Sequence, residues 1–213
     1  MPRPEPKLEN LVVLVVWASA VNRQIPGSGY GHAALWIPHH PTNYGTYISL
    51  WPADQPSFSA LLDGTGGPMS QRPNFHSYLR DKAAEGNKEP DFTFCLYCLD
   101  AAAIIKEFDR TRATTKEWRL YGNMMAFIGS ENTRADSCSS LCYRLLEHGG
   151  MVKSSSLGSI ISPDDLCLLV QQERKAELNE GDYATKIAAF PPPKNVKEMS
   201  LENLPGKKGC RLL

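Results

Sequence analysis

One cysteine in this sequence is well placed for nucleophilic chemistry. In the stretch DSCSSLCYRLLEHGG, Cys138 lies in the first turn of a predicted helix that is capped by Asp136 or Ser137 and ends at two glycines. The helix dipole and the unpaired N–H groups at such a position favour a thiolate over a thiol. Cys142 lies one turn further along, where the dipole has little influence. We therefore take Cys138 as the candidate nucleophile, with a buried structural cysteine as the alternative interpretation.

His32 is the histidine best suited to activate that cysteine. It follows the glycine-rich stretch GSGYG and opens the apolar segment HAALWI, so its ring is expected at the start of a strand with space beside it. The other histidines fall in a predicted turn, in a long loop or at the far end of the Cys138 helix: His39, His40, His76 and His148. A cysteine at a helix start that faces a histidine on a neighbouring strand is the general thiol–imidazole arrangement. A structural histidine on an apolar strand remains the alternative.

The elements that must position these two residues indicate an α+β fold, with an antiparallel sheet packed against helices. Short apolar runs predict strands at residues 11–18, 32–37, 46–52 and 91–99. The second and third of these strands are expected to form a hairpin. Capping residues and apolar periodicity predict helices after Asp100, around Cys138 and after Ser162. Residues 53–89 show no clear period and are predicted to form a long loop, which suggests a functional insertion or a lid.

Length and composition favour a single domain with loosely structured ends. We divide the 213 residues into a flexible arm at 1–10, a catalytic domain at 11–184 and a disordered, Pro- and Lys-rich tail at 185–213. Basic and acidic residues both number 23, so the zero net charge gives no reason to expect a nucleic-acid partner. The apolar stretch LVVLVVWASA is too short to span a bilayer and lacks a basic flank, which favours a buried strand over a signal peptide.

The cysteines do not form a pattern typical of a metal site. Six of them are scattered along the chain, and we expect free thiols in a reducing compartment. Cys95 and Cys98 have C-x-x-C spacing, but residues three apart on a strand point to opposite faces, and no second pair completes a zinc site. The stretch GTGG lacks the lysine of a phosphate-binding loop. The sequence therefore predicts neither a metal nor a resident cofactor.

The last four residues, CRLL, fit a prenylation motif of the geranylgeranyl type. Cys210 would be the lipidated thiol, and Lys207 and Lys208 add attraction to anionic lipids. One prenyl chain with two lysines predicts reversible attachment to a membrane surface. Prenylation takes place in the eukaryotic cytosol, so we expect the cytoplasmic face of a eukaryotic membrane, with an ordinary cytoplasmic tail as the alternative.

Four segments in a fixed order resemble a known superfamily. The segments GHAALWI, YISLWP, CLDAAAIIKEF and DSCSSLCYRLLEHGG together resemble the circularly permuted branch of the NlpC-type papain-like superfamily, over roughly Leu11 to Leu169. Within it, the chain looks most like the Rho-inactivation domain of bacterial toxins and related effectors. The resemblance implies a permuted papain-like thiol fold, with His32 as general base and Cys138 as nucleophile. The third, orienting position would fall at Ser49; the flanking polar residues Asn43 and Asp54 are the alternatives.

The same resemblance implies a function. It predicts a thiol-dependent acyltransferase that forms an acyl-cysteine and transfers a fatty acyl group from acyl-CoA to protein lysines, with membrane-associated small GTPases as acceptors. A cysteine protease, amidase or lipid acylhydrolase would use the same cysteine and histidine, and residue types alone do not separate water from an amine as acceptor. A non-catalytic, membrane-anchored binding protein is the third interpretation, because serine orients a histidine more weakly than a carboxylate does.

Overall fold

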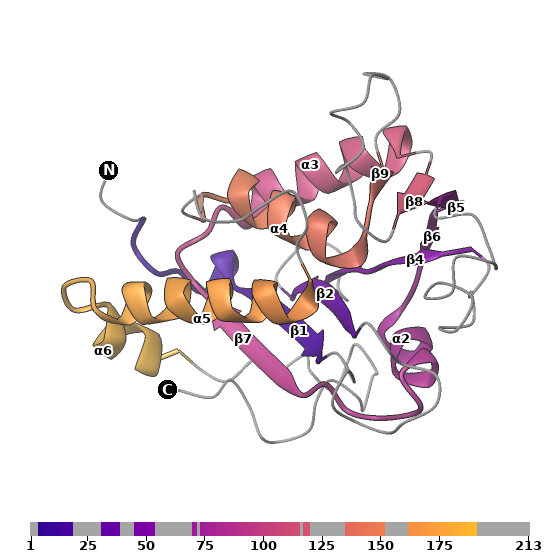
Figure 1. The fold of residues 1–213 in the computed structure, drawn as a ribbon. Coiled ribbons are helices and arrows are strands. Elements are labelled where there is room, and N and C mark those ends of the chain that lie inside the picture. The colour runs from indigo at the N-terminus through magenta and orange to yellow at the C-terminus, as the bar shows by residue number, and fades with distance from the viewer. Residues whose placement is uncertain are drawn as a thin grey trace.

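A four-stranded antiparallel sheet forms the centre of the fold (Figure 1). The computed structural model describes residues 4–18, 31–38, 45–53, 70–71, 73–115, 117–119, 135–151 and 162–190. Its sheet has the order β3-β2-β1-β7, with strands β1 (Val12–Trp17), β2 (His32–Ile37), β3 (Thr46–Ile48) and β7 (Phe92–Leu96). Neighbouring strands in this sheet all run antiparallel, so the predicted hairpin of β2 and β3 is confirmed. The predicted α+β class is confirmed as well.

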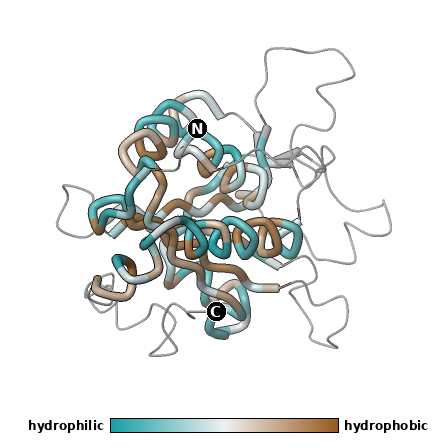
Figure 2. Tube along the Cα trace, turned by 90° about the vertical axis from the view of Figure 1, so that its left-hand side faces the viewer, coloured by the Kyte–Doolittle hydropathy of each residue, from teal (hydrophilic) through white to brown (hydrophobic). Residues whose placement is uncertain are grey.

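Strand β1 is buried on both faces, as its unbroken run of apolar residues predicts. All six of its residues are buried, and alternate side chains enter two different hydrophobic clusters. Val12, Leu14 and Val16 belong to the larger cluster, whereas Val13 and Val15 belong to the smaller one. Figure 2 shows the same arrangement as hydrophobic strands inside the molecule and helices with hydrophilic outer faces. Both faces of the sheet are therefore covered.

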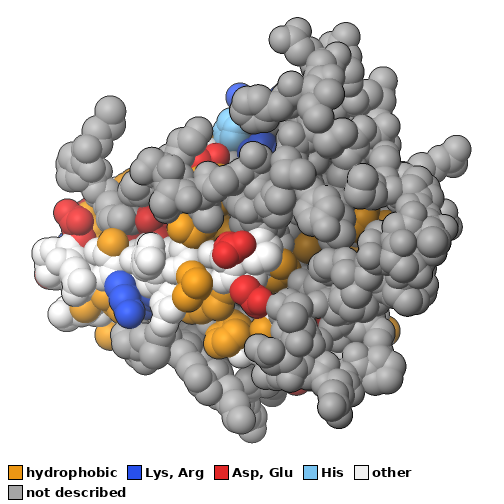
Figure 3. All heavy atoms as spheres, viewed as in Figure 1, with side chains coloured by type: hydrophobic (Ala, Val, Ile, Leu, Met, Phe, Trp, Pro, Cys, Tyr) orange, Lys and Arg blue, Asp and Glu red, His pale blue; other side chains and the backbone are white. Residues whose placement is uncertain are grey.

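Three helices cover the face of the larger cluster: α3 (Ala101–Thr114), α4 (Cys138–His148) and α5 (Pro163–Leu178). The caps predicted for α3 and α5 are present. The Asp100 carboxylate accepts a hydrogen bond from the Ala103 N–H at 2.9 Å, and Ser162 forms a reciprocal capping box with Asp165. Figure 3 shows hydrophobic side chains on the face that α5 occupies, and Leu168 of α5 is 59% exposed.

The smaller cluster joins both ends of the described chain. It includes Tyr78 of α2 (Tyr78–Ala84) and Ile187 of α6 (Tyr183–Ala188), and Leu8 of the short helix η1 (Leu8–Asn10) packs against it. The Lys7 N–H also donates a hydrogen bond to the Tyr97 carbonyl at 3.1 Å. Residues of the segments at both ends of the described chain therefore pack on one cluster, Leu8 partly buried and Ile187 buried.

Residues 53–89 are not wholly a loop, so that prediction is wrong in part. They contain β5 (Ser70–Gln71), β6 (Pro73–Phe75) and α2. Strand β6 pairs with β4 (Leu50–Pro52), while β5 joins β8 (Glu117–Arg119) and β9 (Ala135–Asp136) in a small third sheet. These elements are two to seven residues long and are too short to show a hydrophobic period. No helix in the described parts of the chain is both long and apolar enough to cross a membrane.

Candidate active site

Helix α4 begins at Cys138 because the residues around it form a capping box. The Ser137 hydroxyl accepts a hydrogen bond from the Ser140 N–H at 3.2 Å, and the Ser140 hydroxyl accepts one from the Ser137 N–H at 2.8 Å. The helix ends at Gly149, and Gly150 has a positive φ of 97°. Both ends predicted from the sequence are confirmed, and the Cys138 thiol lies at the positive end of the helix.

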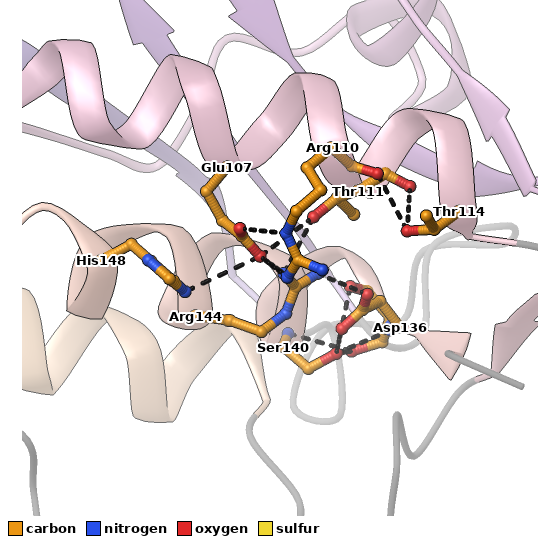
Figure 4. A network of polar contacts seen from close by, with 9 residues as sticks. Glu107, Arg110, Thr111, Thr114, Asp136, Ser140, Arg144 and His148 are labelled. Atoms are coloured by element: carbon orange, nitrogen blue, oxygen red, sulfur yellow. Dashed lines mark hydrogen bonds and ion pairs between the residues drawn. The ribbon is translucent and has the colours of Figure 1, made fainter. Parts of the chain in front are cut away.

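A buried network of charges ties the start of α4 to α3 (Figure 4). Arg144, in the middle of α4, donates hydrogen bonds to Asp136 at 2.6 Å and to Glu107 of α3 at 2.8 Å. Its guanidinium also donates to the Thr111 hydroxyl at 2.9 Å. Asp136 lies two residues before Cys138 and is 3% exposed. The network therefore fixes the backbone that leads into the candidate nucleophile.

His32 is the first residue of β2, and its ring is buried against polar groups from two other parts of the chain. Its Nε2 atom lies 2.9 Å from the Ser49 hydroxyl and 3.1 Å from Asp81 Oδ2. Since Nε2 is occupied by these two partners, Nδ1 is the ring nitrogen left to interact with the Cys138 thiol. A hydrogen bond joins that thiol to the His32 ring, and the sulfur also accepts a hydrogen bond from the backbone N–H of Ala33.

Asp81 is a buried carboxylate surrounded by hydrogen-bond donors. It lies on α2 with no exposed surface, and both of its oxygens are used. Oδ2 accepts a hydrogen bond from the Tyr47 hydroxyl at 2.7 Å in addition to facing His32. Oδ1 accepts one from the Trp51 indole N–H at 2.7 Å and lies 3.4 Å from His76 Nδ1. This set of donors allows the carboxylate to remain ionised without solvent.

These contacts shift the three pKa values toward a charged site. Burial opposes protonation of His32, but the charge and hydrogen bond of Asp81 together with Cys138 raise the pKa of His32 to about 10. Burial opposes ionisation of Asp81, yet His32 and the other donors lower its pKa below the usual range. Burial also opposes ionisation of Cys138, but His32, the Ser139 hydroxyl and the Ala33 N–H lower its pKa. All three shifts favour the same charged form of the site, a thiolate beside an imidazolium and a carboxylate.

Cys138 has a lowered pKa, whereas Cys142 and Cys167 have raised ones. Burial raises the pKa of Cys142 well above the usual thiol value, and burial with the nearby Asp164 raises that of Cys167 to about 11. Cys98 is also a free, buried thiol. The difference between Cys138 and Cys142 arises because burial of the Cys138 thiol is offset by its contacts with His32, whereas burial of Cys142 is reinforced by the nearby negative groups.

The structure brings together the two residues that the sequence singled out for chemistry, Cys138 and His32. It also places Ser49, the expected third residue, on the Nε2 side of His32. Sequence reasoning missed Asp81, because the helix that carries it lies inside the predicted loop. A signal existed in SYLRDKAA, where Ser77 precedes a short run of good helix formers. Asn43, Asp54 and Cys210 lie outside the described residues.

Taken together, the site has a thiol, an imidazole and a carboxylate in hydrogen-bonded sequence. That order of groups can carry out nucleophilic attack on an acyl carbonyl. Within the described residues, no group of three or more His, Cys, Asp and Glu side chains is arranged to hold a metal ion. In comparisons with known proteins, no family model, no curated protein and no solved structure matches the chain.

Proposed function

We propose that this protein is a thiol-dependent acyl-transfer enzyme that forms an acyl-cysteine intermediate at Cys138. The observation that carries the proposal is the chain of contacts from Asp81 through His32 to Cys138. A structural cysteine has no need of a lowered pKa, whereas a nucleophile gains reactivity from it. The resemblance to permuted papain-like domains supports the same assignment of roles, with Asp81 joining Ser49 at the orienting position.

In the first step, the Cys138 thiolate attacks the acyl carbonyl carbon, and a C–S bond forms as the bond to the leaving group breaks. The leaving group takes the proton held on His32 Nδ1. In the second step, an amine or water attacks the thioester, His32 accepts a proton from it, and the thiolate is released. The backbone N–H of Cys138, which has no intrahelical partner at the first position of α4, can donate to the oxyanion.

The resemblance supports a fatty acyl chain as the transferred group and acyl-CoA as its donor. It also supports protein lysines as the acceptors, on membrane-associated small GTPases. Prenylation of Cys210 is part of this proposal and would hold the protein at the cytoplasmic face of a eukaryotic membrane. Attachment there would concentrate enzyme, lipid donor and lipidated acceptors on one surface without any new contact between them.

Intact-protein mass spectrometry after incubation with a long-chain acyl-CoA tests the proposal. Wild type should gain a hydroxylamine-sensitive acyl adduct that is lost in Cys138→Ala and slowed in His32→Ala. Cys167→Ala is the matched control, since this buried thiol on α5 has a raised pKa and should not affect the adduct. An added lysine-bearing acceptor should then remove the acyl group from the enzyme.

Two other results would reject the transferase. A reactive Cys138 that never carries an acyl group from acyl-CoA would instead favour a hydrolase, such as a protease, an amidase or a lipid acylhydrolase. A Cys138 that is also unreactive toward a small alkylating agent at neutral pH would leave a membrane-anchored binding protein. The alkylation experiment therefore distinguishes an unreactive Cys138 thiol from a reactive one that does not accept an acyl group from acyl-CoA.

A further inference from the structure

A second histidine contacts the carboxylate that holds His32. His76 Nδ1 lies 3.4 Å from Asp81 Oδ1, and the His76 side chain is 9% exposed. Its ring is stacked with Trp51 at 5.4 Å between centroids, and Trp51 is in turn stacked with His32 at 4.4 Å. The reaction described above uses neither His76 nor Trp51. Two imidazole rings therefore share one carboxylate and one indole.

Hydrogen bonding assigns the proton of the His76 ring to Nδ1. The Asn74 side-chain nitrogen lies 3.2 Å from His76 Nε2, and an amide nitrogen can only donate. Nε2 must then accept, so the proton of the neutral ring is on Nδ1, the atom that faces Asp81. His76 Nδ1 is buried, and among the described residues no acceptor, Asp81 included, meets it in strict hydrogen-bond geometry; its contact with Asp81 Oδ1 is an ion-pair distance of 3.4 Å. A buried N–H without an acceptor is costly, which directs this proton to the carboxylate.

The donors around Asp81 are divided between its two oxygens. Tyr47 and His32 contact Oδ2, whereas Trp51 and His76 contact Oδ1. Donors on Oδ1 resist rotation of the carboxyl group and thereby keep Oδ2 directed at His32. His76 contributes twice, because its N–H contacts Oδ1 directly and its ring packs on Trp51, whose indole N–H donates to the same oxygen. Its backbone is held as well, by a hydrogen bond of 3.3 Å from its N–H to the Ser49 carbonyl.

We propose that His76 is a positioning residue for the Cys138–His32 pair, acting through Asp81: its Nδ1–H fixes the carboxyl group so that the carboxylate keeps His32 in place beside the thiol. The inference rests on the proposed function only in taking Cys138 as the reacting group. Its effect is on the thiolate itself, so the state of the Cys138 thiol reports on His76 whichever acyl group, if any, the protein transfers.

Two substitutions separate the hydrogen bond from the ring packing. His76→Phe keeps a ring against Trp51 but has no donor for Asp81, whereas His76→Asn places an amide N–H near the former Nδ1 and gives up the ring. The rate of Cys138 alkylation by iodoacetamide at neutral pH is measured by mass spectrometry of the Cys138 peptide. We expect the rate to fall roughly tenfold or more in H76F, since a hydrogen bond to a charged group is lost, and most of that loss to be recovered in H76N.

An H76F rate equal to wild type would overturn the inference. Equal slowing in H76F and H76N, with both proteins folded by circular dichroism, would also overturn it, because His76 would then act through packing alone. If H76F does not fold, long-range ¹⁵N–¹H NMR of the wild-type histidines decides. A proton on His76 Nδ1 supports the proposal, and a bare Nδ1 rejects it. A failed acyl-CoA experiment would leave these outcomes unchanged, so the two proposals can fail separately.

Discussion

Asp81 Oδ2 lies 3.1 Å from His32 Nε2, although 49 positions separate the two residues in the sequence. Both side chains are almost completely buried, at 0% and 2% exposed. The carboxylate comes from a short helix rather than from the strand that follows His32. Ser49, which lies between β3 and β4, contacts the same nitrogen. A charged orienting group therefore acts beside the neutral hydroxyl expected from the sequence, and a charge holds an imidazolium more strongly than a hydroxyl does.

The relative weight of these two partners is testable by substitution. Asp81→Asn removes the charge that raises the pKa of His32, so we expect the rate of Cys138 alkylation at neutral pH to fall by at least about tenfold, the change that one pKa unit corresponds to. Ser49→Ala removes a neutral hydrogen bond and should cost only about two- to tenfold. Iodoacetamide labelling, resolved by peptide mass spectrometry, measures both. A larger loss in Ser49→Ala than in Asp81→Asn would contradict this ranking.

The pH dependence of alkylation should report the lowered pKa of Cys138. In wild type, the pH at half-maximal labelling is expected below about 8.5, the value of an ordinary thiol. In His32→Ala, burial of the thiol is no longer offset by a neighbouring cation, so the midpoint should move above that value. The buried Cys98, Cys142 and Cys167 provide the background, which is measured in Cys138→Ala. A wild-type midpoint at or above 8.5 would mean that no thiolate is stabilised.

Stability should also depend on pH through His32 and Asp81, with opposite signs. The pKa of His32 is raised from 6.5 to about 10, so the stabilisation it provides is complete below about pH 6.5 and is lost as the pH rises through 10. The pKa of Asp81 is lowered from 3.8, so its contribution is present above pH 3.8 and is lost as the pH falls below that. Urea unfolding from pH 3 to pH 10 measures both losses. Asp81→Asn should flatten both limbs relative to wild type, and identical pH profiles would refute the coupling.

The network at the start of α4 predicts a large loss of stability from one substitution. Arg144→Met leaves Glu107 and Asp136, which are 6% and 3% exposed, without their shared cation. We expect the free energy of unfolding to fall by about 3–5 kcal/mol, the usual cost of removing one partner from a buried ion pair. Urea denaturation provides the measurement. Arg110→Ala is the control: Arg110 contacts the same Glu107 at 2.6 Å, but its side chain is 56% exposed, so its loss should have a much smaller effect.

Local signals in the sequence were enough to find the cysteine, the histidine and the helix caps. Ser137 and Ser162 cap their helices through residues three positions away, and such contacts depend on little beyond the nearby chain. Asp81 depends on tertiary contacts instead. Apart from His76, which precedes α2, its partners come from β2, β3 and β4, and its neighbours in the sequence do not distinguish it from a surface aspartate. Asp81 becomes fully buried (0% exposed) and contacts His32 only once α2 has packed against the sheet.

The elements that carry His32 and Asp81 are held in the fold with unequal strength. His32 belongs to a strand that has hydrogen-bonded neighbours on both sides, whereas Asp81 sits on a helix of seven residues. A helix of that length is not stable by itself in water and depends on the contacts of Tyr78 and Asp81. Local unfolding of α2 can therefore occur at a lower free energy than global unfolding of the sheet. On heating, the site would lose its carboxylate while most of the secondary structure persists, and inactivation would precede melting.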